Sequence, residues 1–457
     1  MTIDQIRIYA ATGALGMGFL DSSLERATDW SPHMIGCDAG STDSGPTHLG
    51  ASKPKMSEAA IRRDLSRLLK ARDRLKIPLI IGSCGTSGTD IGVNWMRRIT
   101  EELAIELELS FRMTMIYTEQ KPEKMERAWN EGKIHALPGA PIISAETFRE
   151  CSHIVAMAGA EVYQKALQDG ADVILAGRSS DTAIYAALPL IHGFPPGPVW
   201  HCAKTIECGA VCSTKMRADG MMGYIDHDGF IIEPAALDAA ATPLGIASHT
   251  LYENADPFLI TEPSGVLDTS DATYKPYGNR STRVEGMKFE HRPYTIKLEG
   301  AIKTGYQSVA IGGVRDPLII KQMNHWQTEM MEQFADRASE LFDLSLGDDL
   351  HIEIKNYGQN AVMGSQETNS VDAHEVGLLF VVTAPTQKLA NDVARFVVHL
   401  ASHWPIPEWD GFISGIAFPF SPPEIDRGPA YRFALNHVIV PKDPFELFGF
   451  ETVEVGA

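Results

Sequence analysis

The apolar stretch Met34-Ile35-Gly36-Cys37 runs directly into Asp38-Ala39-Gly40-Ser41-Thr42-Asp43-Ser44-Gly45-Pro46, a loop of small and polar residues. Two later segments repeat this arrangement: residues 77–81 precede Gly82-Ser83-Cys84-Gly85-Thr86-Ser87-Gly88-Thr89-Asp90, and residues 172–176 precede Gly177-Arg178-Ser179-Ser180-Asp181-Thr182. Short, unbroken apolar runs are typical of buried parallel strands, and the loops at the carboxyl ends of such strands meet at the ligand crevice of an open α/β sheet. The three loops therefore predict one shared ligand site.

Segments with helical periodicity lie between these apolar runs. We expect helices over residues 20–28, 57–75, 94–107 and 161–169, and further strands over residues 6–10 and 111–117. Strands that alternate with helices are typical of a doubly wound parallel sheet. The sequence predicts such an α/β domain over residues 1–200.

The pattern changes after Phe194-Pro195-Pro196-Gly197-Pro198. Residues 201–290 are rich in Gly, Pro and Asp, and we interpret them as an irregular extension over the site, with Glu207, His249 or Tyr252 at its rim. Within residues 291–457 we expect strands over 307–311, 350–355, 378–383 and 433–440 and helices over 324–342 and 387–403. This β-α-β-β-α-β order predicts a smaller, ferredoxin-like α+β domain.

Length, charge and the lengths of the apolar runs argue against a nucleic-acid-binding protein and against a membrane protein. The chain of 457 residues is long enough for about two domains. Its 59 acidic and 40 basic residues give a formal charge of −19 at pH 7, which disfavours binding to nucleic acid. No apolar run reaches the roughly 18 residues that span a bilayer, and Met1-Thr2-Ile3-Asp4 leads into a strand instead of a signal peptide. We therefore expect a cytoplasmic protein that binds neither nucleic acid nor membranes.

Two patterns come close to metal or cofactor motifs without matching them. Cys202, Cys208 and Cys212 lie beside His201, but zinc sites favour a paired C-x2-C spacing and no second pair follows, so small buried thiols are favoured over a metal site. The glycines within residues 11–18 have the spacing Gly-x-x-Gly-x-Gly, which is not the G-x-G-x-x-G of dinucleotide-binding proteins. The sequence predicts no metal and no cofactor.

Several long motifs are shared with a known family. They are Asp38-Ala39-Gly40-Ser41-Thr42-Asp43-Ser44-Gly45-Pro46, Pro78-Leu79-Ile80-Ile81-Gly82-Ser83-Cys84-Gly85, Gly170-Ala171-Asp172-Val173-Ile174-Leu175-Ala176-Gly177-Arg178, His249-Thr250-Leu251-Tyr252-Glu253-Asn254-Ala255-Asp256-Pro257 and Lys297-Leu298-Glu299-Gly300-Ala301. On these motifs, over most of its length, the chain resembles the acyclic terpene utilisation protein A (AtuA) family. The resemblance implies a role in the catabolism of citronellol- and geraniol-type acids as CoA thioesters, and a smaller ferredoxin-like partner that is fused or on a separate chain. It supplies neither a reaction nor a catalytic residue.

The three loops supply most of the candidate substrate-binding residues. The Arg178 guanidinium can hold a carboxylate bidentately beside the amino end of the following helix, or it can pair with Asp38, Asp43 or Asp181 and only tie the loops together. Lys297 and Glu299 share one face of a strand and either reach toward the crevice or only solvate that strand. The predicted binding residues are Ser41, Thr42, Ser83, Gly85, Thr86, Ser87, Arg178, Ser179, Ser180, Asp181, His249, Lys297 and Glu299.

Three residues are candidates for the chemistry itself. Asp38 or Asp43 can act as a general base, or can simply cap a turn. Cys84 is a candidate nucleophile because the glycines around it expose backbone amides that can form an oxyanion hole, with His201 or His249 as its base; a small buried filler is the alternative.

The favoured function is a lyase, a hydratase or dehydratase that acts on a small hydroxy or unsaturated carboxylic acid or its CoA thioester. One alternative is a hydrolase that uses Cys84 or a loop serine, and the other is a non-catalytic acyl-binding subunit of a larger complex. The expected partners are this small molecule, a small ferredoxin-like subunit, and further copies of the chain in a homo-oligomer.

Overall fold

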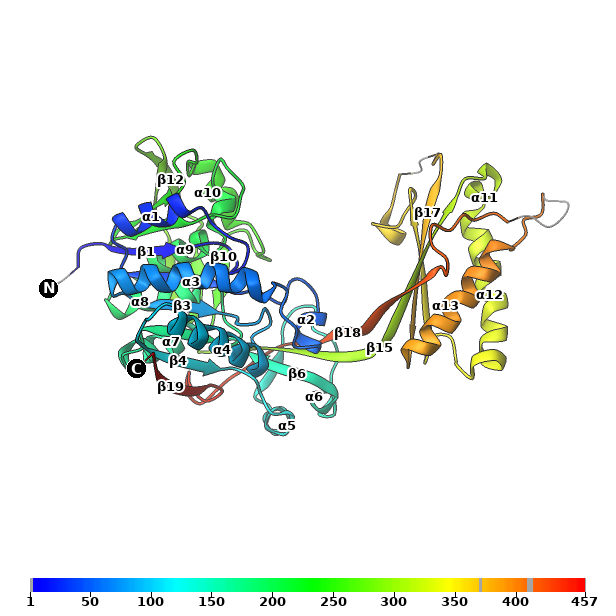
Figure 1. Cartoon of the computed structure of the whole chain (residues 1–457), viewed down its shortest axis with the longest axis horizontal. Coiled ribbons are helices and arrows are strands. Elements are labelled where there is room, and N and C mark those ends of the chain that lie inside the picture. The colour runs from blue at the N-terminus through cyan, green and yellow to red at the C-terminus, as the bar shows by residue number, and fades with distance from the viewer. Residues whose placement is uncertain (1–2, 370–371, 409–413, 457) are drawn as a thin grey trace. The chain divides into compact units, whose positions relative to one another are not determined.

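The computed structural model describes residues 3–369, 372–408 and 414–456, and it has the mixed α/β class that the sequence predicts. The chain divides into a larger unit, which comprises Met1–Ile302 and Phe433–Ala457, and a smaller unit, which comprises Lys303–Arg432 (Figure 1). Residues 291–302 and those from Phe433 onward, which the sequence pattern groups with the α+β segment, lie in the larger unit.

The larger unit is built on a ten-stranded sheet with the order β12-β13-β9-β8-β1-β2-β3-β7-β4-β19. Its central strands pair in parallel. In sheet order they are β1 (Ile6–Ala10), β2 (Met34–Asp38), β3 (Leu79–Gly82), β7 (Val173–Ala176) and β4 (Phe111–Tyr117). Every residue of β2, β3 and β7 is buried, which explains why these strands appear in the sequence as unbroken apolar runs.

Helices cover both faces of this sheet. On one face lie α1 (Asp21–Asp29), α3 (Glu58–Leu75) and α4 (Asp90–Glu106), and on the other lie α7 (Ala160–Gln168), α8 (Ala183–Ile191) and α9 (Pro196–Ile206). The α3 and α4 helices begin at side-chain caps, because Ser57 accepts a hydrogen bond from the Ala60 amide and Thr89 accepts one from the Gly92 amide. The two apolar layers around Leu65 and Trp200 form the core of the unit.

Antiparallel strands complete both edges of the sheet. One edge is extended by β8 (Met221–Ile225), β9 (Gly229–Pro234), β13 (Ser281–Glu285) and β12 (Thr273–Tyr277). At the other edge β19 (Gly449–Val455) pairs with β4, Gly449 opposite Tyr117. The prediction that residues 201–290 are irregular is therefore wrong, because these four strands lie in this range together with further short strands that form a separate sheet. Tight turns join β8 to β9 and β12 to β13, β13 pairs with β9, and the group joins the main sheet because β8 aligns with β1, Ile225 opposite Ile6.

Shorter elements surround this framework. They are α2 (Thr47–Gly50), α5 (Pro122–Asn130), β5 (Ile134–Ala136), α6 (Thr147–Glu150), β6 (Cys151–Ala156), the 3-10 turn η1 (Gly209–Cys212), α10 (Pro243–Thr250), β10 (Leu259–Glu262), β11 (Gly265–Asp268) and β14 (Lys288–His291). The first part of the long strand β15 (Ile296–Val314) pairs with β6, Leu298 opposite Ala156. This pairing brings Glu299 into the larger unit beside the parallel sheet.

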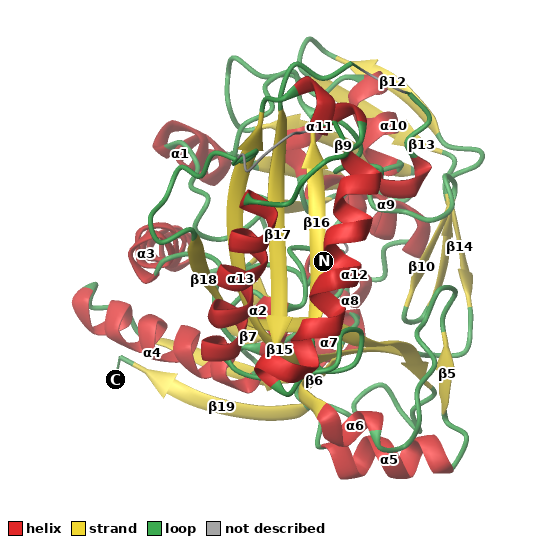
Figure 2. Ribbon diagram, turned by 90° about the vertical axis from the view of Figure 1, so that its right-hand side faces the viewer, coloured by secondary structure: helices red, strands yellow, loops and turns green. Residues whose placement is uncertain are grey.

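The smaller unit contains the rest of β15 and α11 (Pro317–Lys321), α12 (Met323–Phe342), β16 (His351–Tyr357), the 3-10 turn η2 (Gly364–Gln366), β17 (Val376–Ala384), α13 (Gln387–Ser402) and most of β18 (Glu424–Ile439). Its strands have the order β16-β17-β15-β18, and α12 and α13 lie alongside them (Figure 2). Trp326 and Phe334 of α12 share a buried core with Phe380 of β17. Among the helices of the described residues, none is long and apolar enough to cross a membrane.

Candidate functional site

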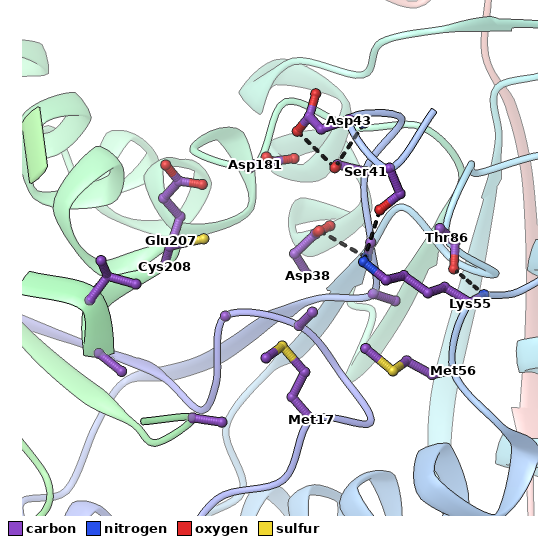
Figure 3. Close-up of a pocket in the computed structure, with 18 of the residues that line it drawn as sticks. Met17, Asp38, Ser41, Asp43, Lys55, Met56, Thr86, Asp181, Glu207 and Cys208 are labelled. Carbon is purple, nitrogen blue, oxygen red and sulfur yellow. Dashed lines mark hydrogen bonds between the residues drawn. The ribbon is translucent and has the colours of Figure 1, made fainter. Parts of the chain in front are cut away.

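A cavity of about 540 Å³ lies in the larger unit, at the carboxyl ends of the parallel strands (Figure 3). Because β2 pairs in parallel with β3, and β3 with β7, the loops that follow these strands meet at one edge of the sheet, as the sequence predicts. The loops are in close contact: a Cβ atom on Gly40 would lie only 2.6 Å from the Thr86 Cα, and Gly40 has a φ of +143°. Only glycine fits there.

Asp38, the last residue of β2, lines this cavity and is 5% exposed. Its Oδ2 atom accepts a hydrogen bond of 2.9 Å from the Gly40 amide, whereas its Oδ1 atom has no hydrogen-bond partner among the described residues. Burial and the neighbouring Asp181 raise the pKa of Asp38 well above its ordinary value, although Arg178 opposes this rise. The Gly40 amide and the Ser83 side chain also lower this pKa, each by less than Arg178 does.

Further acidic side chains line the cavity beside Asp38. Burial raises the pKa of Asp181, with Arg178 opposing and Asp43 adding to the rise. Burial also raises the pKa of Glu207, even though the Lys204 ammonium donates to Glu207 Oε1 over 2.6 Å. Carboxyl groups that lie close together and are shielded from water favour retention of protons, so Asp38, Asp181 and Glu207 are suited to proton transfer.

Arg178 does not line the cavity. Its Nε donates to Glu299 Oε2 over 2.8 Å, and its Nη1 donates to the Ser179 carbonyl over 3.0 Å and to the Ser83 hydroxyl over 3.3 Å. The Asp181 carboxylate lies 3.5 Å from the same Nη1. These contacts match the interpretation in which Arg178 ties the loops together, and they do not favour its role as the carboxylate-binding fork.

Glu299 is fully engaged in the same network. Besides Arg178 it contacts Lys297 Nζ at 2.9 Å, and it accepts a hydrogen bond of 3.1 Å from the Thr42 hydroxyl. Burial alone would raise the pKa of Glu299, but Arg178 and Lys297 more than offset it and lower the value to about 2. Glu299 is therefore charged at neutral pH and anchors the β2 and β7 loops.

Cys84 is completely buried and does not line the cavity. Its thiol lies 3.7 Å from the Ile81 carbonyl, and burial, with Asp38 second, raises its pKa. A nucleophilic thiol needs the opposite environment, an accessible position and a lowered pKa. The placement favours the small buried filler.

Of the other predicted site residues, the structure brings Ser41, Asp43, Thr86 and Asp181 together with Asp38 in the cavity wall. The remaining ones support the loops from behind. Ser179 donates to the Gly177 carbonyl, Ser180 to Glu262, and Ser87 to the His48 carbonyl, while Gly85 packs on Gly92 and His249 stacks on Tyr252.

Glu207 and Tyr252 line the cavity from the 201–290 segment, whereas His249 is buried behind it. Sequence reasoning missed Met17, Lys55, Met56 and Glu253. Met17 follows β1, which is also a parallel strand, so that loop could have been included by the same rule. Lys55 precedes the α3 cap, where no strand-end pattern identifies it.

The cysteine cluster does not assemble as a metal site. Cys202 is buried on α9, Cys212 donates to the Gly209 carbonyl, and Cys208 lines the cavity. In the described ranges, no three His, Cys, Asp or Glu side chains are grouped so that they could hold a metal ion.

Comparisons with known proteins identify the family. No curated protein and no solved structure matches the chain. The family model described as "Acyclic terpene utilisation family protein AtuA" matches residues 51–214 and 222–408, which include the β3 and β7 loops and most of the smaller unit. This match covers well over half of the sequence, and the chain therefore belongs to the AtuA family of acyclic terpene utilisation proteins.

Proposed function

We propose that this protein is a hydro-lyase that adds water to, or removes water from, a small unsaturated or hydroxy carboxylic acid or its CoA thioester. The observation that carries the proposal is the Asp38 carboxyl group, which belongs to the cavity lining, is buried, has a raised pKa and has one oxygen atom, Oδ1, without a hydrogen-bond partner among the described residues. A carboxyl group in this state is suited to exchange a proton with a bound substrate.

In the dehydration direction, Asp38 takes a proton from the carbon next to the carbonyl group. The electron pair of that C–H bond forms the carbon–carbon double bond, and the C–O bond to the neighbouring hydroxyl breaks. Asp181 or Glu207, whose pKa values are raised, gives the leaving hydroxide the proton that makes it water. Hydration is the reverse of these steps.

The cavity wall also suits an acyl group. Met17, Met56, Val211 and Met216 form an apolar part of the lining, and methionine side chains adapt to irregular apolar ligands. The family's link to terpene utilisation supports an acid of this kind. The hydrolase alternative loses its Cys84 version, because Cys84 lies outside the lining, whereas the loop serines Ser41 and Ser44 belong to the lining and keep its serine version open.

The test is turnover by the purified chain. Crotonate, 3-methylcrotonate and their CoA thioesters are incubated with the protein, the ultraviolet absorption of the conjugated double bond is followed, and deuterium incorporation at C2 is measured in D₂O. Asp38→Asn keeps the side-chain size but cannot carry the proton, so activity and exchange are expected to fall about 10²- to 10⁴-fold. Asp169→Asn, an exposed carboxylate paired with Lys165, is the matched control.

Asp38→Asn activity within a few fold of the wild type would contradict the proposal. If the wild-type chain turns over none of these substrates but binds them, the acyl-binding subunit becomes the better function. A ferredoxin-like partner chain or a homo-oligomer would then have to supply the missing groups.

We also propose the finer fold assignment, a doubly wound sheet in the larger unit and a ferredoxin-like smaller unit. Support comes from the helices on both faces of the parallel strands, and from the element order β15-α12-β16-β17-α13-β18 with the sheet order β16-β17-β15-β18.

A further inference from the structure

Lys55 is the basic residue of the cavity wall that has no carboxylate partner. Two basic residues are found in the lining, Lys55 and Arg217. Arg217 is paired with Asp238. The Lys55 ammonium donates over 2.9 Å to the neutral hydroxyl of Ser44, and no ion pair of Lys55 occurs among the residues that the structure describes. Its positive charge is therefore available to a ligand.

Backbone amides of other residues in the cavity wall have no acceptor within the described part of the protein. The Lys55 amide donates to the Thr86 hydroxyl over 2.9 Å, which fixes this residue against the β3 loop. Within the described chain, the amides of Ser41, Ser44 and Thr86, which all line the cavity, donate to no protein acceptor. Thr86 has a φ of +80°, which is rare for a β-branched residue and typical of ligand-binding loops.

The cavity is electrically asymmetric. Figure 3 shows Asp38 between Lys55 on one side and Glu207 on the other. Lys55, with the Ser44 hydroxyl beside it, offers hydrogen bonds to an anion, whereas the Glu207 side presents carboxyl groups. A bound acid is expected to place its carboxylate at Lys55 and its hydroxyl group toward Glu207.

We infer that Lys55 binds the carboxylate of the substrate acid and thereby sets which carbon atom faces Asp38. This inference rests on the proposed function for the identity of the substrate class. It replaces Arg178, whose guanidinium is occupied by Glu299, as the carboxylate-binding residue.

The test measures binding without turnover. Butanoate and 3-methylbutanoate are saturated and cannot be hydrated, so their affinities are compared by calorimetric titration with those of the neutral amides butanamide and 3-methylbutanamide. The wild type is expected to prefer the acids by about 10-fold or more, and this preference should weaken with added salt. Lys55→Gln should abolish the preference and Lys55→Arg should keep most of it. Lys53→Gln, an exposed lysine two positions away that does not line the cavity, should behave as the wild type.

The inference is overturned if wild-type protein binds none of the acids, if it does not prefer them to the amides, or if Lys55→Gln keeps the preference. Butanoyl-CoA is titrated in the same way, and a fourth result also overturns the inference: Lys55→Gln weakens the binding of butanoyl-CoA but not of butanoate, which would assign Lys55 to a phosphate of CoA. Failure of the proposed function looks different, because the Lys55-dependent preference would persist while no substrate is turned over.

Discussion

Glu299→Gln tests whether the ion pair behind the cavity is a structural anchor. The change keeps the shape of the side chain but removes its charge, which Arg178 and Lys297 stabilise in the folded protein. The pKa of Glu299 is lowered from 4.5 to about 2, and at 1.36 kcal/mol per pKa unit this corresponds to about 3 kcal/mol of folding free energy at pH 7. Glu299→Gln is expected to lose this whole amount, because Glu299 is only 4% exposed and solvent hardly screens its charge.

The pH dependence of this loss has a definite sign. A carboxyl group with a lowered pKa stabilises the folded state above its unfolded pKa, and this stabilisation disappears as the pH falls toward the folded pKa. In urea unfolding followed by tryptophan fluorescence, the difference between the wild type and Glu299→Gln should be constant above about pH 5 and should narrow to about 2 kcal/mol at pH 3.5. Glu290→Gln, which removes an exposed pair with Arg292, should cost about 1 kcal/mol or less. A loss below about 1 kcal/mol for Glu299→Gln, or a difference that does not change with pH, would refute the reasoning.

Two further changes test the larger unit, the first its packing and the second the titration of a buried histidine. Gly88→Ala should destabilise it by about 2 kcal/mol or more in the same assay, because φ is +71° and the new Cβ would lie 1.9 Å from the Arg178 amide nitrogen. Gly139→Ala, the control, has a similar φ of +74° but open space around the new Cβ, and it should cost only about 1 kcal/mol. Equal losses for the two variants would contradict this prediction. His201 is buried, and burial lowers its pKa from 6.5 to about 3. As the pH falls, the unfolded state therefore binds a proton at His201 before the folded state does. The free energy of unfolding of the wild type should fall by about 2 kcal/mol through this group between pH 7.5 and pH 5. His201→Phe should lose correspondingly less stability over that range, and parallel pH profiles would show that His201 does not titrate as proposed.

Local sequence patterns predicted the helices and strands that have a clear hydrophobic periodicity of their own. The apolar runs that form β2, β3 and β7 were recognisable, and so was the amphipathic helix α3, because each has a periodicity of its own. The strand β19 was missed. Its alternating pattern is weak, and it becomes a strand through pairing with β4, which precedes it by more than 300 residues.

The residues of the candidate site also divide into those that local sequence predicts and those that depend on contacts distant in the sequence. Asp38, Asp43 and Ser41 were predictable because they lie at the end of a buried parallel strand or just after it, and the cavity wall contains all three. The role of Arg178 was not, because its partner Glu299 is 121 positions away in the sequence. Lys55 was not predicted either, since it follows no strand and its backbone contact in the β3 loop, Thr86, is 31 positions away in the sequence.

The pairing of β19 with β4 has a consequence for synthesis on the ribosome. β4 is made early, yet the strand that covers its outer edge, residues 449–455, emerges only after the whole smaller unit has been translated. Until then the nascent larger unit exposes a row of unpaired backbone amides and carbonyls, which is a template for pairing with other chains. The smaller unit is a contiguous segment with a core of its own, so it can fold while the edge of β4 is still unpaired. The edge of β4 stays exposed for the time that the ribosome needs to translate the smaller unit.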